Sequence, residues 1–325
     1  MMLTYEKSGV SIERGDEVVS RIKKIVPEIG DFGGFFPLEL SGCKKPLLVA
    51  GADGVGTKIR IALDADLVDT IGIDLVAMNV NDVLCSGAKP LFFLDYIAAG
   101  KIDPNKIERI IKGIVAGCKI SNCRLLGGET AEMPGIYTEG DYDLAGFAVG
   151  IVDDEMRLGA HKVREGDILL GLGSSGLHSN GYSLARAAMA DKMTDSIQNL
   201  LAAPTRIYVQ SVLHAIAETE IHSIAHITGG GIEGNLCRAI PKGLCAEIDS
   251  YSWSVPEIFR LIQEFGEIEE AEMRKTFNLG IGMILVLPES SVERAASLLE
   301  SHGEIVRIIG KVKSGNGIEW SIGRK

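Results

Sequence analysis

The sequence predicts an α/β or α+β protein built from two halves of roughly equal size. At 325 residues the chain is longer than one ordinary domain and fits two. Short runs of branched apolar residues, typical of strands, alternate with apolar residues at helical spacing. Residues 153–167 are charged and contain no long apolar run, so they separate the halves. We therefore expect two mixed α/β domains, residues 1–166 and residues 167–325.

The elements expected in the N-terminal half follow from these patterns in chain order. Apolar residues along one side predict a helix over residues 15–26, which Pro27 ends. A second helix is expected over residues 68–86, ended by Gly87, and a third over residues 104–118, where apolar residues recur at i, i+3, i+4 and i+7. Apolar runs predict strands at residues 47–50, 91–98 and 144–152, and one near residue 125 that leads into a polar turn.

The C-terminal half continues the alternation with its own set of elements. Five apolar runs predict strands at residues 168–172, 223–227, 244–248, 281–287 and 305–312. Amphipathic stretches predict helices at residues 182–190, 204–218, 233–240, 256–265 and 291–302. Because strands and helices alternate, we expect crossover connections in this half as well.

Composition excludes several classes of partner. The net charge of −11 argues against nucleic acid and against an anionic membrane, since both select a basic surface. No run of 18 apolar residues occurs and the first residues lack an apolar signal segment, so we expect a cytoplasmic protein. The six cysteines include no C-x-x-C pair, which predicts reduced thiols rather than disulfides or a zinc site.

The stretch over residues 46–58 is the first candidate site. A strand runs into a turn with glycines at positions 51, 54 and 56, and Asp53 and Lys58 flank the bare backbone. A carboxylate can hold Mg²⁺ against polyphosphate oxygens, and an ammonium can neutralise them. The P-loop pattern G-x-x-x-x-G-K-S/T is not met, because Thr57 and Lys58 stand in reversed order. A plain glycine turn between two elements is the alternative interpretation.

The helix expected over residues 68–86 carries polar residues in apolar surroundings. Asp74 and Asn81 are seven residues apart and share a face, with Asp82 beside them. Acids among apolar residues are costly unless they are paired or bind a metal. This helix is therefore a second candidate for a metal or phosphate site.

Two glycine-rich loops match the dinucleotide pattern G-x-G-x-x-G, at residues 171–176 and 229–234. In the first loop, Leu-His-Ser-Asn-Gly interrupts the helix that should begin at once, and in the second the helix is only about eight residues long before Pro241. Both loops still suit a phosphate, since glycines lead into a helix N-terminus. His178 lies in the first of these loops. It is either a proton-transfer group, for which an ordinary histidine pKa is suitable, or a hydrogen-bonded loop residue.

Another glycine-containing segment precedes the first strand. Residues 30–36 are apolar, and Gly33 and Gly34 loosen them. Such a segment either packs against a partner or folds over a ligand.

Five longer strings of residues are more specific than these motifs. They are Thr70-Ile-Gly-Ile-Asp-Leu-Val-Ala-Met with Asn81-Asp82, Leu91-Phe-Phe-Leu-Asp-Tyr, Gly127-Gly-Glu-Thr-Ala-Glu-Met-Pro-Gly, Ser174-Ser-Gly-Leu-His-Ser-Asn-Gly-Tyr-Ser and Ala225-His-Ile-Thr-Gly-Gly-Gly. Together they closely resemble the phosphoribosylformylglycinamidine cyclo-ligase family of de novo purine biosynthesis. The resemblance runs from Tyr5 to about Val312.

The resemblance implies a reaction, its cofactors and an assembly. Formylglycinamidine ribonucleotide and ATP would give aminoimidazole ribonucleotide, ADP and phosphate, with Mg²⁺ as the metal. It also implies a homodimer in which the N-terminal domains, which bind ATP and Mg²⁺, pair their strands in a shared β-barrel near the site.

The residues expected at that site fall into four groups. The metal ligands are Asp53, Asp82 and Glu129. The catalytic residues are Lys58, which neutralises phosphate, His178 and Asp82. The ATP-binding set is Lys23, which is included through the resemblance alone, with Gly33, Gly34, Asp53, Gly54, Gly56, Thr57, Lys58, Asn81 and Glu129. The substrate's ribose phosphate is assigned to Gly229, Gly230 and Gly231.

Two other functions are compatible with the fold class. A regulatory nucleotide-binding protein would keep the glycines and lose the acids, but Asp53, Asp82 and Glu129 are all present. An ATP-dependent phosphotransferase of the same superfamily would keep both and act on another small substrate. The substrate that triggers ADP release would distinguish these alternatives.

Overall fold

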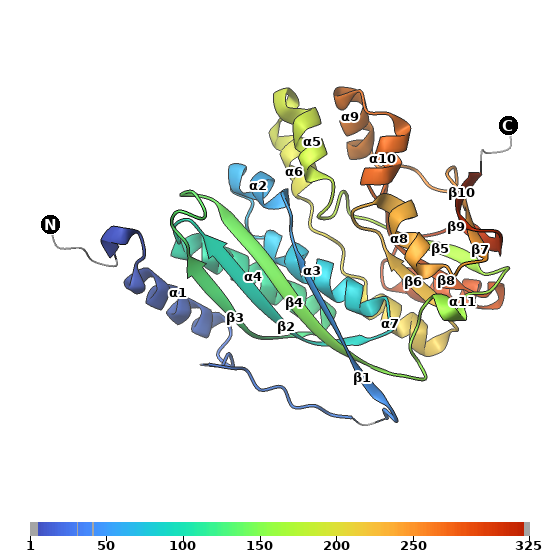
Figure 1. The fold of residues 1–325 in the computed structure, drawn as a ribbon, viewed down its shortest axis with the longest axis horizontal. Coiled ribbons are helices and arrows are strands. Elements are labelled where there is room, and N and C mark those ends of the chain that lie inside the picture. The colour runs from blue at the N-terminus through green and yellow to red at the C-terminus, as the bar shows by residue number, and fades with distance from the viewer. Residues whose placement is uncertain (1–5, 31, 41, 322–325) are drawn as a thin grey trace.

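The computed structural model describes residues 6–30, 32–40 and 42–321, which form two open β-sheets. The first sheet has the strand order β1-β4-β2-β3 and the second has the order β10-β7-β9-β5-β8-β6. The first consists of β1 (Pro46–Gly54), β2 (Lys89–Ala99), β3 (Arg124–Glu132) and β4 (Tyr142–Asp153). The second consists of β5 (Ile168–Gly173), β6 (Ser223–His226), β7 (Leu244–Asp249), β8 (Ile281–Leu287), β9 (Val306–Ser314) and β10 (Gly317–Ser321). Figure 1 shows the two sheets side by side along the long axis of the molecule.

The helices divide between the halves in the same way. Those of the N-terminal half are α1 (Ile12–Ile25), α2 (Lys58–Asp64), α3 (Ile71–Leu84) and α4 (Pro104–Ser121). Those of the C-terminal half are α5 (Tyr182–Met189), α6 (Asp195–Ala202), α7 (Val209–Glu218), α8 (Gly231–Ala239), α9 (Glu257–Gly266), α10 (Glu270–Thr276) and α11 (Glu289–Ser301). Within the described ranges, every helix is too short or too polar to cross a membrane.

Local sequence explains the sharp ends of α4. The Asp103 side chain accepts a hydrogen bond from the Asn105 N–H, and Pro104 occupies the first turn, where a missing N–H costs nothing. At the other end Asn122 takes the left-handed conformation that stops a helix. The isoleucine stripe between these ends is buried, as its spacing predicts.

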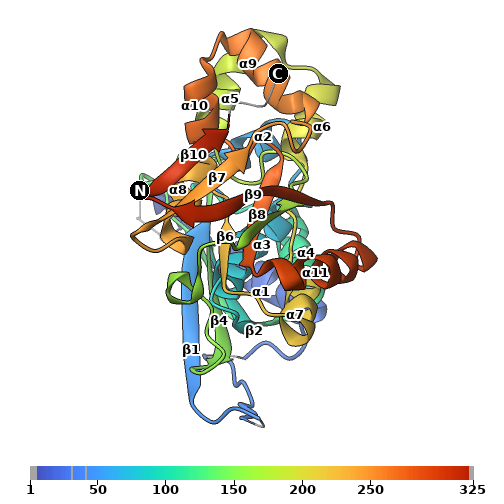
Figure 2. The same cartoon turned by 90° about the vertical axis from the view of Figure 1, so that its right-hand side faces the viewer.

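Helices α3 and α4 cover one face of the first sheet and leave the other open. Strand β4 runs antiparallel to both β1 and β2, and β3 is parallel to β2. The side chains of β4 that face α3 are buried, and Leu47 and Val49 of β1 are half-buried there, whereas Leu48 and Phe147 on the opposite face are 63% and 43% exposed. Figure 2 shows the sheet on one side of α3 and α4.

Glycines bring α3 and α4 unusually close together. A Cβ atom at Gly72 would lie 2.3 Å from both the Ile110 carbonyl oxygen and the Ile114 nitrogen. A Cβ atom at Gly113 would lie 2.6 Å from the Asp69 carbonyl oxygen. The two backbones therefore touch where any side chain would separate them.

Helix α3 also belongs to the core of the C-terminal half. One continuous cluster of buried apolar residues joins Leu75 and Val80 of α3 to Leu172, Tyr208 and Met283. The two sheets are thus connected through α3 rather than only through the chain between them.

Most expected elements are present, and the fold class is confirmed as mixed α/β. The structure corrects four details. The sequence analysis missed α2, α6, α10 and β10. Gly51 and Gly54 lie inside β1 rather than in a turn. The polar residues after position 125 continue β3 instead of forming a turn. Residues 204–208, expected at the start of a helix, are not helical. The described residues form no closed barrel, so a shared barrel would require a second chain.

The close approach of α3 and α4 predicts the effect of adding one methyl group. We expect Gly72→Ala to lower the free energy of unfolding by about 1–3 kcal/mol, because the helices have to separate. Gly15→Ala is the control, because a Cβ at Gly15 meets nothing within 4 Å and alanine favours helix α1. Denaturant unfolding of both variants measures the difference. Equal stability of the two variants would contradict the close contact.

Candidate active site

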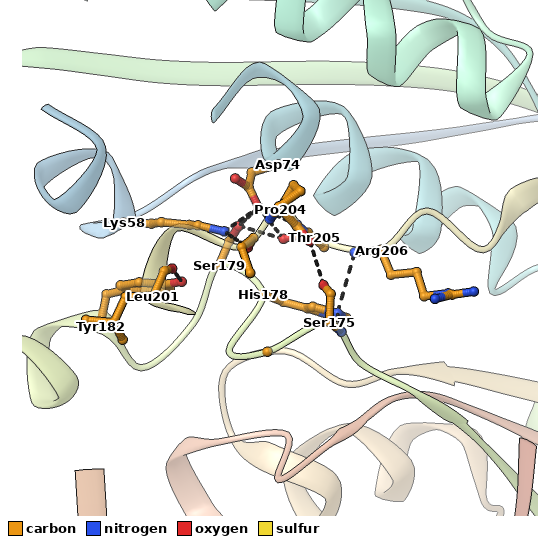
Figure 3. Close-up of polar contacts among 12 residues, drawn as sticks. Lys58, Asp74, Ser175, His178, Ser179, Tyr182, Leu201, Pro204, Thr205 and Arg206 are labelled. Atoms are coloured by element: carbon orange, nitrogen blue, oxygen red, sulfur yellow. Dashed lines mark hydrogen bonds and ion pairs between the residues drawn. The ribbon is translucent and has the colours of Figure 1, made fainter. Parts of the chain in front are cut away.

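A buried ion pair lies between the two halves. The Lys58 ammonium, at the start of α2, donates to Asp74 Oδ1 at 2.7 Å and to the Ala203 carbonyl oxygen at 2.6 Å. Asp74 Oδ1 also accepts from the Thr205 N–H at 2.7 Å, and the Thr205 and Ser179 hydroxyls lie near it (Figure 3). Both charged side chains are almost fully buried. Burial lowers the pKa of Lys58, and the Asp74 carboxylate opposes this shift.

This position changes the role expected for Lys58. Its side chain is 1% exposed, and protein oxygens surround its ammonium. The expectation that Lys58 meets a nucleotide phosphate does not fit this arrangement, because the phosphate would have to displace a buried carboxylate. The ion pair instead fixes the turn after β1 against residues 203–205.

Asn81 holds the next part of the same C-terminal segment. Its Nδ2 donates to the Arg206 carbonyl oxygen at 2.9 Å, and its Oδ1 accepts from the Tyr208 N–H at 3.1 Å. Asp74 and Asn81 therefore bind residues 203–208, which we call the clamped segment. The seven-residue spacing explains why both side chains reach it from one face of α3.

His178 is enclosed beside the clamped segment. Its Nε2 accepts from the Ser175 N–H at 3.2 Å and lies 3.5 Å from the Arg206 N–H. Burial lowers the pKa of His178 well below its ordinary value, and nearby His226, Lys58 and Arg206 lower it further. The expectation of an ordinary pKa for His178 is therefore wrong: the imidazole is neutral, and with Nε2 accepting, its proton is on Nδ1. That nitrogen is buried without a hydrogen-bond partner.

Asp53 and Asp82 form an acidic pair on the helix-covered side of the sheet. Asp53 lies near the end of β1, and Asp82 lies in the last turn of α3. Burial raises the pKa of Asp53, and the Asp82 carboxylate raises it further, as two facing acids do. Asp82 Oδ1 lies 2.8 Å from His226 Nδ1, a distance at which the ring N–H donates to the carboxylate oxygen.

The turn after β1 lies close to the loop that carries His178. Gly56 has a φ of +54°, which favours glycine, and a Cβ there would lie 3.6 Å from the Ser179 carbonyl oxygen. The hydroxyls of Thr57 and Ser183 are 3.1 Å apart. Gly54 is also restricted, because a Cβ there would lie 2.8 Å from the Leu144 carbonyl oxygen. The structure therefore brings the first glycine motif next to the C-terminal half.

The second glycine loop, residues 228–231, leads into α8. Asn235 anchors it, since its Nδ2 donates to the carbonyl oxygens of Gly229 at 3.1 Å and Gly231 at 2.7 Å. A Cβ at Gly229 would lie 3.3 Å from Asn180 Oδ1, so this loop lies against the loop that bears His178. The Asn180 Nδ2 group is buried without a partner, which makes it a free donor beside the expected phosphate loop.

The remaining expected residues lie at the other edge of the first sheet. Gly34 packs against the backbone of Leu126 in β3, and Lys23 is exposed on α1. Asp31, in the expected loop over residues 30–36, lies outside the described residues. Asp53 belongs to β1, at the opposite edge of this sheet. A single chain therefore does not gather the whole expected ATP-binding set.

Glu129 also faces away from the acidic pair. Asp95 and Gly128 are partners in register, and a Cβ at Gly128 would lie 2.3 Å from Asp95 Oδ1, so both point toward the helices. Glu129 follows Gly128 and must point to the uncovered face, because side chains alternate along a strand. Asp53 shares the face of Asp95 through the partner Gly146. One chain thus places Glu129 and Asp53 on opposite faces of the sheet.

The acidic pair suits a hard cation. Mg²⁺ is commonly held by one or two protein carboxylates together with substrate phosphates and water. Asp53 and Asp82 supply two such carboxylates. Among the residues that the structure describes, no three His, Cys, Asp or Glu side chains gather into a metal-binding group. The three-carboxylate set expected from the sequence is therefore not assembled within one chain.

Sequence reasoning missed three residues of this region: His226, Asn180 and Asn235. His226 and Asn180 lie inside strings that carry the family resemblance, and this was the available signal. Asn235 follows Gly231 by one helical turn, which is the spacing for a side chain that reaches back to a loop carbonyl. The six cysteines are free thiols, as the sequence predicts.

The fold defines a class of two-halved α/β proteins with members of known structure. The structure matches a crystal structure of hydrogenase maturation protein HypE in complex with ATP, with a TM-score of 0.71 and 19% identity. The match covers 97% of this chain and 93% of the other. This similarity establishes the fold.

The family follows from the sequence comparisons. Residues 42–152 match the family model AIR synthase related protein, N-terminal domain, and residues 164–322 match the model of the C-terminal domain. The chain belongs to this AIR synthase related family. It is similar to phosphoribosylformylglycinamidine cyclo-ligase of Bacillus cytotoxicus, with 48% identity over 99% of both chains. It is also 52% identical to the chloroplastic/mitochondrial phosphoribosylformylglycinamidine cyclo-ligase of Vigna unguiculata, over 98% of this chain and 83% of the relative.

The buried ion pair predicts a large loss of stability when its acid is neutralised. Asp74→Asn leaves the Lys58 ammonium buried without a counter-charge, so we expect a loss of about 3–5 kcal/mol in the free energy of unfolding. Asp64→Asn is the matched control, because Asp64 pairs with Arg60 on the surface and should matter little. Denaturant unfolding compares the two. An Asp74→Asn variant as stable as the control would exclude the ion pair as a structural support.

The low pKa of His178 predicts a stability that depends on pH. In the unfolded chain His178 binds its proton near the ordinary value of 6.5, whereas the folded imidazole resists protonation. Its contribution is therefore fully present above pH 6.5 and is lost as the pH falls from there toward the folded pKa. In His178→Gln the amide oxygen can accept from the same N–H groups. The pH-dependent contribution of the imidazole to stability is then lost. Melting temperatures between pH 7.5 and 5 should fall more steeply for the wild type, and parallel curves would contradict the prediction.

Proposed function

We propose that the chain is a phosphoribosylformylglycinamidine cyclo-ligase, an ATP-dependent ligase that converts formylglycinamidine ribonucleotide to aminoimidazole ribonucleotide, ADP and phosphate. The observation that carries the proposal is 48% identity, over 99% of both chains, to a relative of that name. The structure adds an acidic pair next to two glycine loops, an arrangement that suits a phosphorylated substrate and a metal-bound nucleotide.

The reaction requires activation of an amide oxygen. This oxygen is a poor leaving group, and transfer of the γ-phosphoryl group of ATP to it forms an O–P bond and makes it a good one. The amidine-side nitrogen then attacks the activated carbon, a C–N bond forms, and the C–O bond breaks with release of phosphate. The protein has to position both substrates, neutralise the transferring phosphoryl group and accept the proton that the nitrogen loses.

In this proposal Asp53 of β1 and Asp82 of α3 would hold Mg²⁺. When bound, Mg²⁺ neutralises the negative charge of the transferring phosphoryl group. Gly54, Gly56 and Thr57 form the adjacent backbone turn, where the lack of side chains lets a nucleotide approach. Lys58 and Asn81 act indirectly, because their contacts with the clamped segment keep that turn and the C-terminal loops in register.

The substrate's ribose phosphate is assigned to the loop of residues 228–231. Asn235 fixes the loop carbonyl oxygens, which orients the peptide groups, and α8 contributes its positive N-terminus. The buried Asn180 Nδ2 lacks a partner and supplies an additional donor. His178 stays neutral, so we assign it a positioning part in the loop rather than the acid–base role.

We further propose a homodimer in which a second chain completes the site. Lys23, Gly33 and Gly34 lie toward the β3 edge, and a second copy can place this edge beside β1 and the acidic pair of the first, whereas Glu129 stays on the uncovered face. Leu48 and Phe147 are exposed on this face and would supply apolar area to such an interface. Two such faces packed together would form the shared barrel. In this proposal residues 1–166 form the domain that dimerises and binds the nucleotide, and residues 167–325 form the C-terminal domain. A cytoplasmic location stays a prediction.

A coupled assay tests the proposed activity. Formylglycinamidine ribonucleotide, ATP and Mg²⁺ together should give ADP and an equal amount of aminoimidazole ribonucleotide, and omission of either substrate should abolish both. Thiamine monophosphate serves as the alternative acceptor, since a thiamine-monophosphate kinase shares the fold. ADP release with that acceptor, or nucleotide binding without turnover, would overturn the proposal.

The homodimer is tested at the uncovered face. The wild type should sediment as a dimer at micromolar concentration, and Phe147→Glu should sediment as a monomer, because it places a charge in the proposed interface. Tyr251→Glu is the control, since Tyr251 is 74% exposed in the C-terminal half. A monomeric wild type, or a dimeric Phe147→Glu variant, would refute this interface.

A further inference from the structure

We propose that His226 is a positioning residue: its imidazole holds the Asp82 carboxylate in place for the cation that accompanies ATP, and it links this carboxylate to the substrate-phosphate loop. The inference rests on the proposed function, because it assumes a cation at the acidic pair. His226 lies in the C-terminal half, so this contact would connect the two substrates' sites.

The contact between Asp82 and His226 joins an exposed side chain to a buried one. The Asp82 side chain is 52% exposed at the end of α3, where a carboxylate is otherwise free to change rotamer. The His226 side chain is 2% exposed, and its Nδ1 is 2.8 Å from Asp82 Oδ1. A donor that is itself held rigidly selects one carboxylate orientation and leaves the other oxygen for a metal. Such contacts to metal-binding carboxylates typically change metal affinity by roughly 10–100-fold.

The rigidity of His226 comes from the second sheet. His226 is the last residue of β6 and lies opposite Met283 of β8. The next residue, Ile227, donates its N–H to the Gly282 carbonyl oxygen at 2.9 Å. Thr228 then begins the loop assigned to the substrate phosphate. The carboxylate for the cation and the loop for the substrate are thus fixed by the same strand end.

The two nitrogens of His226 have different surroundings. Nδ1 contacts Asp82, whereas Nε2 is buried and has no hydrogen-bond partner. A positioning role requires only Nδ1, and a role in direct contact with substrate requires Nε2. Substitutions that conserve one nitrogen at a time separate these roles.

Asparagine and glutamine provide this separation. The amide nitrogen of His226→Asn can occupy the position of Nδ1, and that of His226→Gln can occupy the position of Nε2. We would titrate each folded enzyme with Mn²⁺ in the presence of a non-hydrolysable ATP analogue, and measure the dissociation constant of Mn²⁺ by electron paramagnetic resonance. We expect roughly a 10-fold or greater weakening for His226→Gln and a change within about 3-fold for His226→Asn.

His226→Ser is a second variant that also lacks a donor at Nδ1, for use if the glutamine variant does not fold. Melting temperatures without ligand identify variants that have lost the fold. Wild-type affinity in His226→Gln or His226→Ser would overturn the inference alone, and so would a weaker affinity in His226→Asn than in His226→Gln. A wild-type enzyme that binds no Mn²⁺ with the nucleotide would overturn the proposed function together with the inference.

Discussion

The buried carboxylate of Asp74 is the interaction on which the candidate site depends. A charge inside a protein is costly unless donors surround it, and Asp74 Oδ1 receives an ammonium, an N–H and nearby hydroxyls. These donors come from the start of α2, from the loop after β5 and from the clamped segment. Satisfying one acid therefore brings three distant stretches of the chain together. The second oxygen, Oδ2, is buried without a hydrogen-bond partner, so the cost of removing this carboxylate from water is only partly offset.

The same face of α3 makes three separate contacts with the C-terminal half. Asp74 and Asn81 bind the clamped segment, and Asp82 binds His226. Asn81 lies on the face of Asp74, seven residues away, and Asp82 lies beside it, one residue further around the helix. The apolar side of α3 packs in a core shared by both sheets. One helix thus sets the position of the turn after β1 relative to the loop of residues 228–231, which the proposed function assigns to the nucleotide and to the substrate phosphate.

The sequence predicts the fold well wherever the hydrophobic pattern is strong, as in the periodic stripe of α4 and the continuous apolar run of β8. It fails for short helices such as α2, where too few turns exist for a pattern to form. The sequence indicates which acids lie near the site but not which groups they bind. From the sequence alone, Lys58 is expected to bind phosphate, and only the tertiary structure shows that its ammonium is paired with Asp74. The direction of Glu129 depends on strand register, which a bulge between β2 and β3 shifts and which no local pattern reveals.

The most direct test of the clamp is amide hydrogen exchange in the clamped segment. The N–H groups of Thr205 and Tyr208 are donated to the side chains of Asp74 and Asn81 rather than to a helix or a strand. Residue-resolved exchange of the native protein should therefore show strong protection at both, although the segment has no regular structure. Asp74→Ala should remove the protection at Thr205. Rapid exchange of both groups in the wild type, or unchanged protection at Thr205 in the variant, would contradict the account.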